Sequence, residues 1–216
     1  MKLSDCCSVN GLPQMFGGGT ARREARKYRE NGLSRRIGVL VDQLPTNGIE
    51  GARVLDIGGG VGGAHLELLR RGAAAAVLVE VAPAYENGAR DLASELGHVD
   101  AVEYRLGDFV ALSDGIDPSD IVVLDRVVCC YPDMPALVEG SAARARRFYL
   151  LVAPRENWLW QIFKQMFRVG MWLMRREFRF FLHSLSEIDR RLEGAGFQKM
   201  FETESRLWRS TLFARE

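Results

Sequence analysis

The fold is decided at residues 54–63, which read Val54-Leu55-Asp56-Ile57-Gly58-Gly59-Gly60-Val61-Gly62-Gly63. An apolar run that holds one carboxylate opens here into five glycines within six positions. The β-branched, apolar residues before the glycines are typical of a strand that is buried on both faces. A helical pattern of apolar residues begins directly after them. The stretch therefore predicts a strand, a tight turn that exposes backbone N–H groups to a ligand, and the start of a helix.

The glycine turn predicts a nucleotide-like ligand, and Asp56 distinguishes two of them. Gly58, Gly60 and Gly63 satisfy the G-x-G-x-x-G pattern of dinucleotide sites, which alone is a weak signal. A carboxylate two residues before the first glycine repels a pyrophosphate, whereas it attracts the cationic methionine end of S-adenosylmethionine (SAM). We expect SAM here, with Asp56, Gly58, Gly60 and Gly62 as contacts. An NAD-type oxidoreductase and a purely structural glycine turn are the alternatives.

Composition limits the domain organisation and the partners. The chain has 216 residues, of which 47% are hydrophobic, and a formal net charge of +1. This length suits a single α/β domain over residues 1–216 and is short for two. The balanced charge argues against a nucleic-acid partner. No signal peptide is evident, so we expect a cytoplasmic protein.

The four cysteines occur as two adjacent pairs, Cys6-Cys7 and Cys129-Cys130. Adjacent cysteines do not form the spaced framework of a secreted disulfide scaffold, and they agree with a reducing compartment. Residues 120–128 read as a strand that continues into Cys129-Cys130, and neighbours on a strand point to opposite faces. Because two cysteines also leave a tetrahedral metal shell incomplete, we expect no metal at this pair. A thiophilic metal or metalloid as the methyl acceptor is an alternative interpretation of the cysteines.

The first 48 residues are predicted to form an N-terminal helical lid. Arginines and lysines cluster between residues 22 and 36, and apolar residues follow at mostly helical spacing. Two helices are expected, with a break at Asn31-Gly32 and a stop at residues 45–48. The basic helix is either a solvated face or a lid over an anionic substrate, with Tyr28 as a candidate substrate contact.

Polar side chains follow the next strands at their carboxyl ends. Glu80 ends a strand over residues 75–79, at the position where a carboxylate hydrogen-bonds ribose hydroxyls. Asp108 and Phe109 follow a strand over residues 99–106 and suit an adenine site, the acid for the exocyclic amine and the ring for the base. Arg126, near the end of the fourth strand, completes the predicted cofactor contacts. Since parallel strands present their carboxyl ends at one edge, these groups and Tyr131 should meet there.

The order of these motifs resembles the class I SAM-dependent methyltransferases over nearly the whole chain. Within them, residues 131–133, 153–155 and 181–183 look similar to the magnesium-protoporphyrin IX O-methyltransferases. That family usually has His-Tyr-Pro where Cys130-Tyr131-Pro132 stands, and commonly Tyr-Gly where Phe16-Gly17 stands. The resemblance implies a Rossmann-like fold, with a mostly parallel seven-stranded sheet, helices on both faces and a closing antiparallel pair at residues 198–203 and 207–214. A capping box at Ser184 is expected to begin the helix before this pair.

The predicted reaction is in-line transfer of a methyl group from the SAM sulfonium to an apolar small molecule. A carboxylate acceptor is already ionised and needs no strong base, whereas a phenol or thiol needs one. Tyr131, Cys130 and His183 are the candidate catalytic residues. A protein that binds SAM or a partner without turnover is the alternative from outside the enzymes.

Residues 154–183 form a predicted apolar insertion that is too short and too often charged to span a bilayer. Trp158, Trp160 and Trp172 are its candidate substrate contacts. Three interpretations stay open: additional core, a lid over an apolar and possibly anionic acceptor, and a peripheral membrane contact that uses neighbouring arginines.

Overall fold

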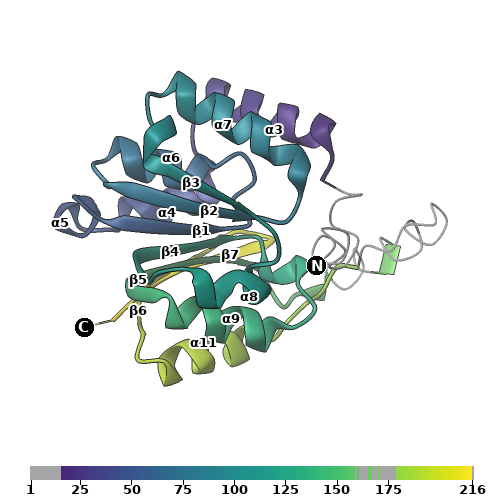
Figure 1. The fold of residues 1–216 in the computed structure, drawn as a ribbon. Coiled ribbons are helices and arrows are strands. Elements are labelled where there is room, and N and C mark those ends of the chain that lie inside the picture. Colours follow the sequence, from purple (N-terminus) through teal and green to yellow (C-terminus); the bar gives the residue numbers. More distant parts are fainter. Residues whose placement is uncertain (1–15, 159, 161–164, 167–169, 171–178, 216) are drawn as a thin grey trace.

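A computed structural model describes residues 16–158, 160, 165–166, 170 and 179–215. Its centre is a seven-stranded sheet in the order β3-β2-β1-β4-β5-β7-β6 (Figure 1). The first five strands are parallel, and β7 runs antiparallel to both β5 and β6. The predicted fold and its closing antiparallel pair are therefore confirmed. The strands are β1 (Arg53–Ile57), β2 (Ala75–Glu80), β3 (Val102–Leu106), β4 (Ser119–Asp125), β5 (Ala145–Pro154), β6 (Gln198–Glu204) and β7 (Trp208–Ala214).

Helices cover both faces of the sheet because its strands are apolar on both sides. Neighbouring residues of β1 enter opposite cores: Val54 joins one buried cluster and Leu55 the other. Figure 1 shows α3, α4, α6 and α7 on the first face and α8, α9 and α11 on the second. The helices are α3 (Gly18–Asn31), α4 (Arg35–Asp42), α5 (Thr46–Ile49), α6 (Gly63–Arg70), α7 (Glu86–Glu95), α8 (Phe109–Leu112), α9 (Met134–Ala143) and α11 (Leu185–Gly194), with short 3₁₀ turns η2 (Pro83–Tyr85), η3 (Val99–Ala101), η4 (Ser113–Gly115) and η5 (Val128–Cys130).

Several elements differ in detail from the sequence predictions. The strand expected from residue 99 begins at Val102, after the turn η3. A third short helix, α5, follows Pro45 where only a stop was expected. Ser184 does precede α11, but its hydroxyl bonds Ser186 and makes no cap, so the predicted capping box is wrong. The backbone N–H of Leu185 instead donates to the Glu156 carboxylate at 2.5 Å, which satisfies one helix-end donor from a distant segment.

The predicted fourth strand ends three residues early. β4 stops at Asp125 because Arg126 adopts a left-handed backbone, with φ of 64°, the one positive φ outside glycine in the described chain. A left-handed residue cannot continue a strand, and the chain turns into η5. Cys129 and Cys130 therefore lie in a 3₁₀ turn, and the expectation that their thiols face opposite sides is wrong. The two Sγ atoms are 3.8 Å apart.

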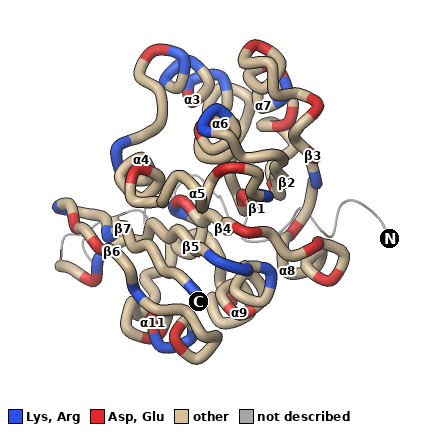
Figure 2. Tube along the Cα trace, turned by 90° about the vertical axis from the view of Figure 1, so that its left-hand side faces the viewer, with Lys and Arg blue, Asp and Glu red and all other residues tan. Residues whose placement is uncertain are grey.

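The surface carries both signs of charge. Figure 2 shows Lys and Arg interspersed with Asp and Glu around the described part of the molecule. On α3 the side chains of Arg22, Arg23, Arg26 and Lys27 are exposed to solvent, while Arg29 forms a bidentate pair with Glu95 of α7. The basic residues of α3 thus serve mainly as a solvated face, and Arg29 fastens the helix to the domain. No helix in the described residues is long and apolar enough to cross a membrane.

Candidate active site

The glycine turn after β1 requires glycine for two physical reasons. Gly58, Gly60 and Gly62 have φ of 62°, 59° and 87°, which side chains rarely adopt. Space is also short: a Cβ on Gly58 would lie 2.9 Å from the Val127 side chain, and a Cβ on Gly59 would overlap the Asp56 carboxylate. The N–H of Gly58 donates to the Val79 carbonyl at 2.7 Å, which anchors the turn to β2.

Asp56 lies beneath this turn and not at its open side. Its side chain is fully buried, and Oδ2 is 2.9 Å from Nδ1 of His65 on α6. Oδ1 has no hydrogen-bond partner among the described residues. From the sequence we expect this carboxylate to face the charged end of a ligand, whereas in the structure its Oδ2 faces the His65 imidazole. Asp56 therefore supports the turn from below by joining the end of β1 to the first turn of α6.

Glu80 connects the end of β2 to the middle of the glycine turn. Its Oε2 accepts a hydrogen bond from the Gly60 N–H at 3.0 Å, and its Oε1 accepts one from the Ala82 N–H at 2.8 Å. Burial raises the pKa of this carboxyl, and the backbone hydrogen bonds oppose that shift. Each carboxylate oxygen keeps further lone pairs, so Glu80 can accept from ligand hydroxyls while it holds the turn. Its predicted position beside the turn is thus observed.

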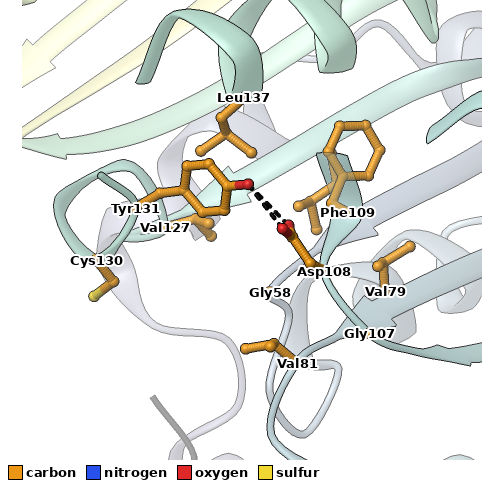
Figure 3. A pocket seen from close by; sticks show the side chains of 11 residues that line it. Gly58, Val79, Val81, Gly107, Asp108, Phe109, Val127, Cys130, Tyr131 and Leu137 are labelled. Atoms are coloured by element: carbon orange, nitrogen blue, oxygen red, sulfur yellow. Dashed lines mark hydrogen bonds between the residues drawn. The ribbon is translucent and has the colours of Figure 1, made fainter. Parts of the chain in front are cut away.

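A pocket of about 400 Å³, partly open to solvent, lies at the carboxyl edge between the ends of β3 and β4. The Asp108 carboxylate accepts from the Val110 N–H at 3.1 Å and caps α8. The Tyr131 hydroxyl donates across the pocket to both oxygens of Asp108 at 3.0 Å (Figure 3). Apolar groups form most of the walls. The lining residues are Ile57, Gly58, Val79, Val81, Gly107, Asp108, Phe109, Val127, Cys130, Tyr131 and Leu137.

Tyr131 is held as a neutral hydroxyl. Burial, followed by the negative charge of Asp108, raises the pKa of Tyr131 well above its usual value near 10. A phenol with a raised pKa stays protonated at neutral pH, so Tyr131 is poorly suited to act as a general base. Its single proton is directed to Asp108, which leaves its oxygen as an acceptor.

The three predicted catalytic residues converge on the η5 turn. Cys130 and Tyr131 both line the pocket. His183 is distant from them in sequence but lies beside them in the structure. Its Nε2 is 2.9 Å from the Tyr131 carbonyl oxygen. Beside it, the Phe181 N–H donates to the Cys129 carbonyl at 2.8 Å. The chain that follows the insertion therefore docks along η5 and brings His183 to the two candidate residues of the turn.

The predicted substrate contacts lie elsewhere or outside the described residues. The Tyr28 ring covers Gly63 on the outer side of the turn, with Cδ2 3.1 Å from the position of a Cβ there. The side chain of Trp158 is exposed. Trp160 is buried and donates from Nε1 to the Leu207 carbonyl at 2.6 Å, with its ring stacked on Phe180. Trp172 lies outside the described residues.

Glu24 is a site residue that sequence reasoning missed. Its carboxylate hangs over the open side of the glycine turn, with Oε2 3.2 Å from where a Cβ of Gly60 would stand. Tyr85 also lies against Gly60, with Cε1 3.2 Å from the position of a Cβ there, and burial, followed by the charge of Glu24, raises the pKa of Tyr85. Arg126, which directly follows β4, interacts electrostatically with Glu24. The sequence signal for Glu24 was a single acidic residue within a run of arginines. The sequence does not show that α3 packs over the glycine turn, because that depends on tertiary contacts.

Phe16 adds an aromatic contact above the same turn. Its ring centroid lies 6.3 Å from that of Tyr85, in a tilted arrangement.

The described residues contain no cluster of three or more His, Cys, Asp or Glu side chains able to hold a metal ion.

Comparison with protein families gives a match over residues 25–200 to a family described as a methyltransferase domain. The chain belongs to this family. It is a SAM-dependent methyltransferase of class I, as the resemblance of its motifs implies. No curated protein matches the sequence of this methyltransferase.

Solved structures share the fold of this methyltransferase at low sequence identity. The magnesium protoporphyrin IX methyltransferase from Synechocystis PCC 6803, with bound S-adenosylhomocysteine (SAH), is 18% identical; the match covers 95% of this chain and 98% of that one, with a TM-score of 0.71. An O-methyltransferase family 2 protein from Planctomyces limnophilus, in complex with apigenin, is 19% identical over 92% of this chain and 62% of that one, with a TM-score of 0.65. The geranyl diphosphate C-methyltransferase from Streptomyces coelicolor A3(2) is 14% identical over 83% and 76%, also with a TM-score of 0.65.

Proposed function

We propose that this methyltransferase transfers a methyl group from SAM to an oxygen atom of an apolar small molecule. The observation that carries the SAM part of the proposal is the apolar pocket at the carboxyl edge of the sheet, closed by the hydrogen bond between Tyr131 and Asp108, because such a pocket suits the adenine base. The structural likeness to an O-methyltransferase family protein crystallised with apigenin supports an oxygen acceptor. A carboxylate or a hydroxyl fits the proposal equally.

The residues at the site fit SAM along its whole length. The apolar walls Val81, Val127 and Leu137 suit the flat faces of adenine, and Asp108 suits its exocyclic amine. Glu80 suits the ribose hydroxyls, next to the cradle formed by Gly60. On this placement Tyr131, through its bond to Asp108, belongs to the adenine end and serves to close the pocket. This differs from its predicted role at the methyl acceptor.

The methionine end of SAM is a zwitterion, and two side chains of opposite charge flank the glycine turn. Glu24 offers a carboxylate above Gly60 for the ammonium group. Arg126 offers a guanidinium for the carboxylate; its Nε lies 3.4 Å from Asp125 Oδ1 in an ion pair. Because a charge-assisted hydrogen bond is about twice as strong as a neutral one, this pair is worth more than neutral groups at the same distance. We infer that the N-terminal helix supplies part of the cofactor site.

The chemistry that SAM supplies is an activated methyl group on a sulfonium. The contribution of the protein is to fix the acceptor oxygen in line with that group and to exclude water, a type of catalysis that yields large rate gains. Cys130 lines the pocket and His183 lies against the Tyr131 backbone, so we infer that these two side chains are the nearest to a bound acceptor. A carboxylate acceptor needs no base, which agrees with a site whose tyrosine stays protonated.

Two measurements test the proposal. Calorimetric titration with SAM and with NAD should give binding of SAM alone. Release of SAH should then be measured with a panel of aromatic carboxylic acids and phenols as methyl acceptors, and with the corresponding amines and thiols as controls. Turnover confined to the oxygen acceptors is the expected result. SAM binding with no turnover on any acceptor would favour a binding protein, and turnover confined to amines or thiols would overturn the oxygen assignment.

A further inference from the structure

His65, in the first turn of α6, is a buried histidine that does not line the pocket. Its Nδ1 lies 2.9 Å from Oδ2 of Asp56, whose side chain is buried as well. Its Nε2 has no hydrogen-bond partner among the residues that the structure describes. Within that part of the chain, the hydrogen bond of the imidazole therefore goes to the carboxylate in β1.

This hydrogen bond fixes a proton at one nitrogen of the ring. A carboxylate oxygen only accepts, so Nδ1 of His65 carries the proton and donates the hydrogen bond to Asp56. The second oxygen of Asp56, Oδ1, is buried and has no hydrogen-bond partner in the described residues. A side chain at position 65 without a donor at the place of Nδ1 would thus leave the buried carboxylate with no hydrogen bond from these residues, which is costly.

The two partners lie against the two ends of the glycine turn. A Cβ on Gly62 would lie 2.6 Å from His65 Nε2, and a Cβ on Gly59 would lie 2.7 Å from Asp56 Oδ1. A hydrogen bond from the Gly62 N–H to the Gly59 carbonyl, at 2.9 Å, closes the turn between them. Because neither glycine carries a side chain, the backbone of the turn rests directly on the His65–Asp56 pair.

The middle of the turn connects this pair to Glu80. Gly60 lies between the two supported ends, and its N–H donates to Glu80 Oε2 at 3.0 Å. We propose that His65 is a positioning residue of the SAM site. Through its Nδ1 donor and its packing on Gly62, it keeps the turn in the conformation that holds Glu80 and the cofactor. This rests on the proposed function, which places SAM at the turn.

Three substitutions separate the donor of His65 from the bulk of its ring. His65→Asn places an amide N–H as many bonds from Cα as Nδ1, His65→Gln places it one bond further out, and His65→Phe keeps a ring without a donor. SAM and SAH should bind His65→Asn within about threefold of the natural protein. They should bind the other two variants at least about tenfold more weakly, because a buried carboxylate without a donor distorts the turn. Calorimetric titration measures these affinities.

The order of the variants distinguishes positioning from packing. If His65 only filled space, His65→Phe, the variant closest to it in size, would bind SAM best, and that result would overturn the proposal. Leu192→Ala controls for lost stability, because this buried side chain of α11 belongs to the core on the other face of the sheet. It should bind SAM as the natural protein does. Melting curves identify any unfolded variant: His65→Gln and His65→Phe replace each other, whereas an unfolded His65→Asn would contradict the expected rescue.

The cofactor-free protein supplies readouts that do not depend on SAM. The chain has three histidines, so the imidazole signals of His65 in NMR spectra are those missing from His65→Asn. They should show a proton on Nδ1, and the Gly60 amide should exchange with solvent at least about tenfold faster in His65→Gln and His65→Phe than in the natural protein. A proton on Nε2 alone, or equal exchange in all variants, would overturn the proposal. Failure of SAM to bind the natural protein, with both readouts as expected, would count against the proposed function alone.

Discussion

At the scale of single residues, Glu80 joins β2 to the glycine turn through two backbone hydrogen bonds. Glu80→Ala removes the acceptor proposed for the ribose and leaves the Gly60 N–H without its partner. Loss of a hydrogen bond between charged and polar groups costs about 1.5–3 kcal/mol, so SAM affinity should fall roughly ten- to hundredfold. Calorimetry on the folded variant measures this. Glu103→Ala, at an exposed position of β3, is the matched control and should bind SAM as the natural protein does.

Glu24 is the residue whose role depends most on the docking of α3. Glu24→Gln keeps the shape of the side chain and removes the charge proposed to face the ammonium group of SAM. Affinity for SAM and SAH should drop about tenfold or more, since hydrogen bonds to charged groups are worth about 1.5–3 kcal/mol. Methylthioadenosine, which lacks the amino-acid part, should bind both proteins alike. Glu30→Gln on the same helix controls for a general charge effect.

Equal weakening of SAM and methylthioadenosine by Glu24→Gln would mean that Glu24 supports the turn without touching the methionine end. The comparison of the two ligands therefore separates contact from support, which SAM affinity by itself does not.

Tyr131 should leave the pH dependence of turnover unchanged. Its pKa is raised by burial and by Asp108, so the hydroxyl stays protonated between pH 6 and 9 and contributes no titration there. Tyr131→Phe should lower SAM affinity by up to about tenfold through the lost bond to Asp108, with a pH–rate profile of the same shape. Disappearance of an acidic limb in the variant would identify Tyr131 as the base after all.

The same shift predicts a stability effect of defined sign. The pKa of Tyr131 is higher in the folded than in the unfolded state. The contribution of its hydroxyl to the free energy of unfolding is therefore complete below the unfolded pKa of about 10, and it is lost as the pH rises above that value. The difference in unfolding free energy between the natural protein and Tyr131→Phe should therefore shrink between pH 8 and pH 11. Urea denaturation at the two pH values measures it.

At the scale of elements, Trp160 joins the start of the insertion to the closing strands β6 and β7. Its indole donates to the Leu207 carbonyl, and its ring meets Trp208 edge-on at 5.3 Å. This packing favours the core interpretation for Trp160 over the lid. Trp160→Ala should lower the unfolding free energy by about 3–5 kcal/mol, the usual cost of truncating a buried aromatic residue.

Trp158→Ala is the matched control, because that side chain is 68% exposed two residues earlier. It should change stability by no more than about 0.5 kcal/mol. Thermal or urea unfolding of both variants provides the comparison. Unchanged stability of Trp160→Ala with a selective loss of turnover on apolar acceptors would restore the lid.

At the scale of the whole molecule, a cofactor that spans the ends of four strands should stabilise the entire domain. A ligand at one hundred times its dissociation constant adds about 2.7 kcal/mol. For a chain of 216 residues each kcal/mol corresponds to about 2–4 °C, so SAM should raise the melting temperature by about 5–10 °C. Scanning calorimetry with SAM, SAH and NAD tests this, and a shift produced by NAD but not by SAM would contradict the family's cofactor in this chain.

Local signals in the amino-acid sequence are enough to predict the order of strands and helices and the edge of the sheet where a ligand binds. Strand periodicity, buried apolar runs and the run of glycines are local signals, and Gly58, Gly60 and Gly62 indeed adopt the left-handed backbone that only glycine enters freely. Glu80, Asp108 and Tyr131 could be placed at one edge because parallel strands must end together. These inferences hold because they need only the chain's neighbouring residues and the rules of parallel sheets.

The orientation of the side chains at the site depends on how the elements pack against one another. Asp56 faces His65 beneath the turn because α6 returns across the end of β1, and Glu24 reaches Gly60 because α3 docks over it. The two cysteines share one side of η5 because the left-handed backbone of Arg126 ends the strand and the chain turns into η5. Each outcome depends on contacts between different elements of the fold or on one backbone angle. The local periodicity of the sequence predicts neither of these.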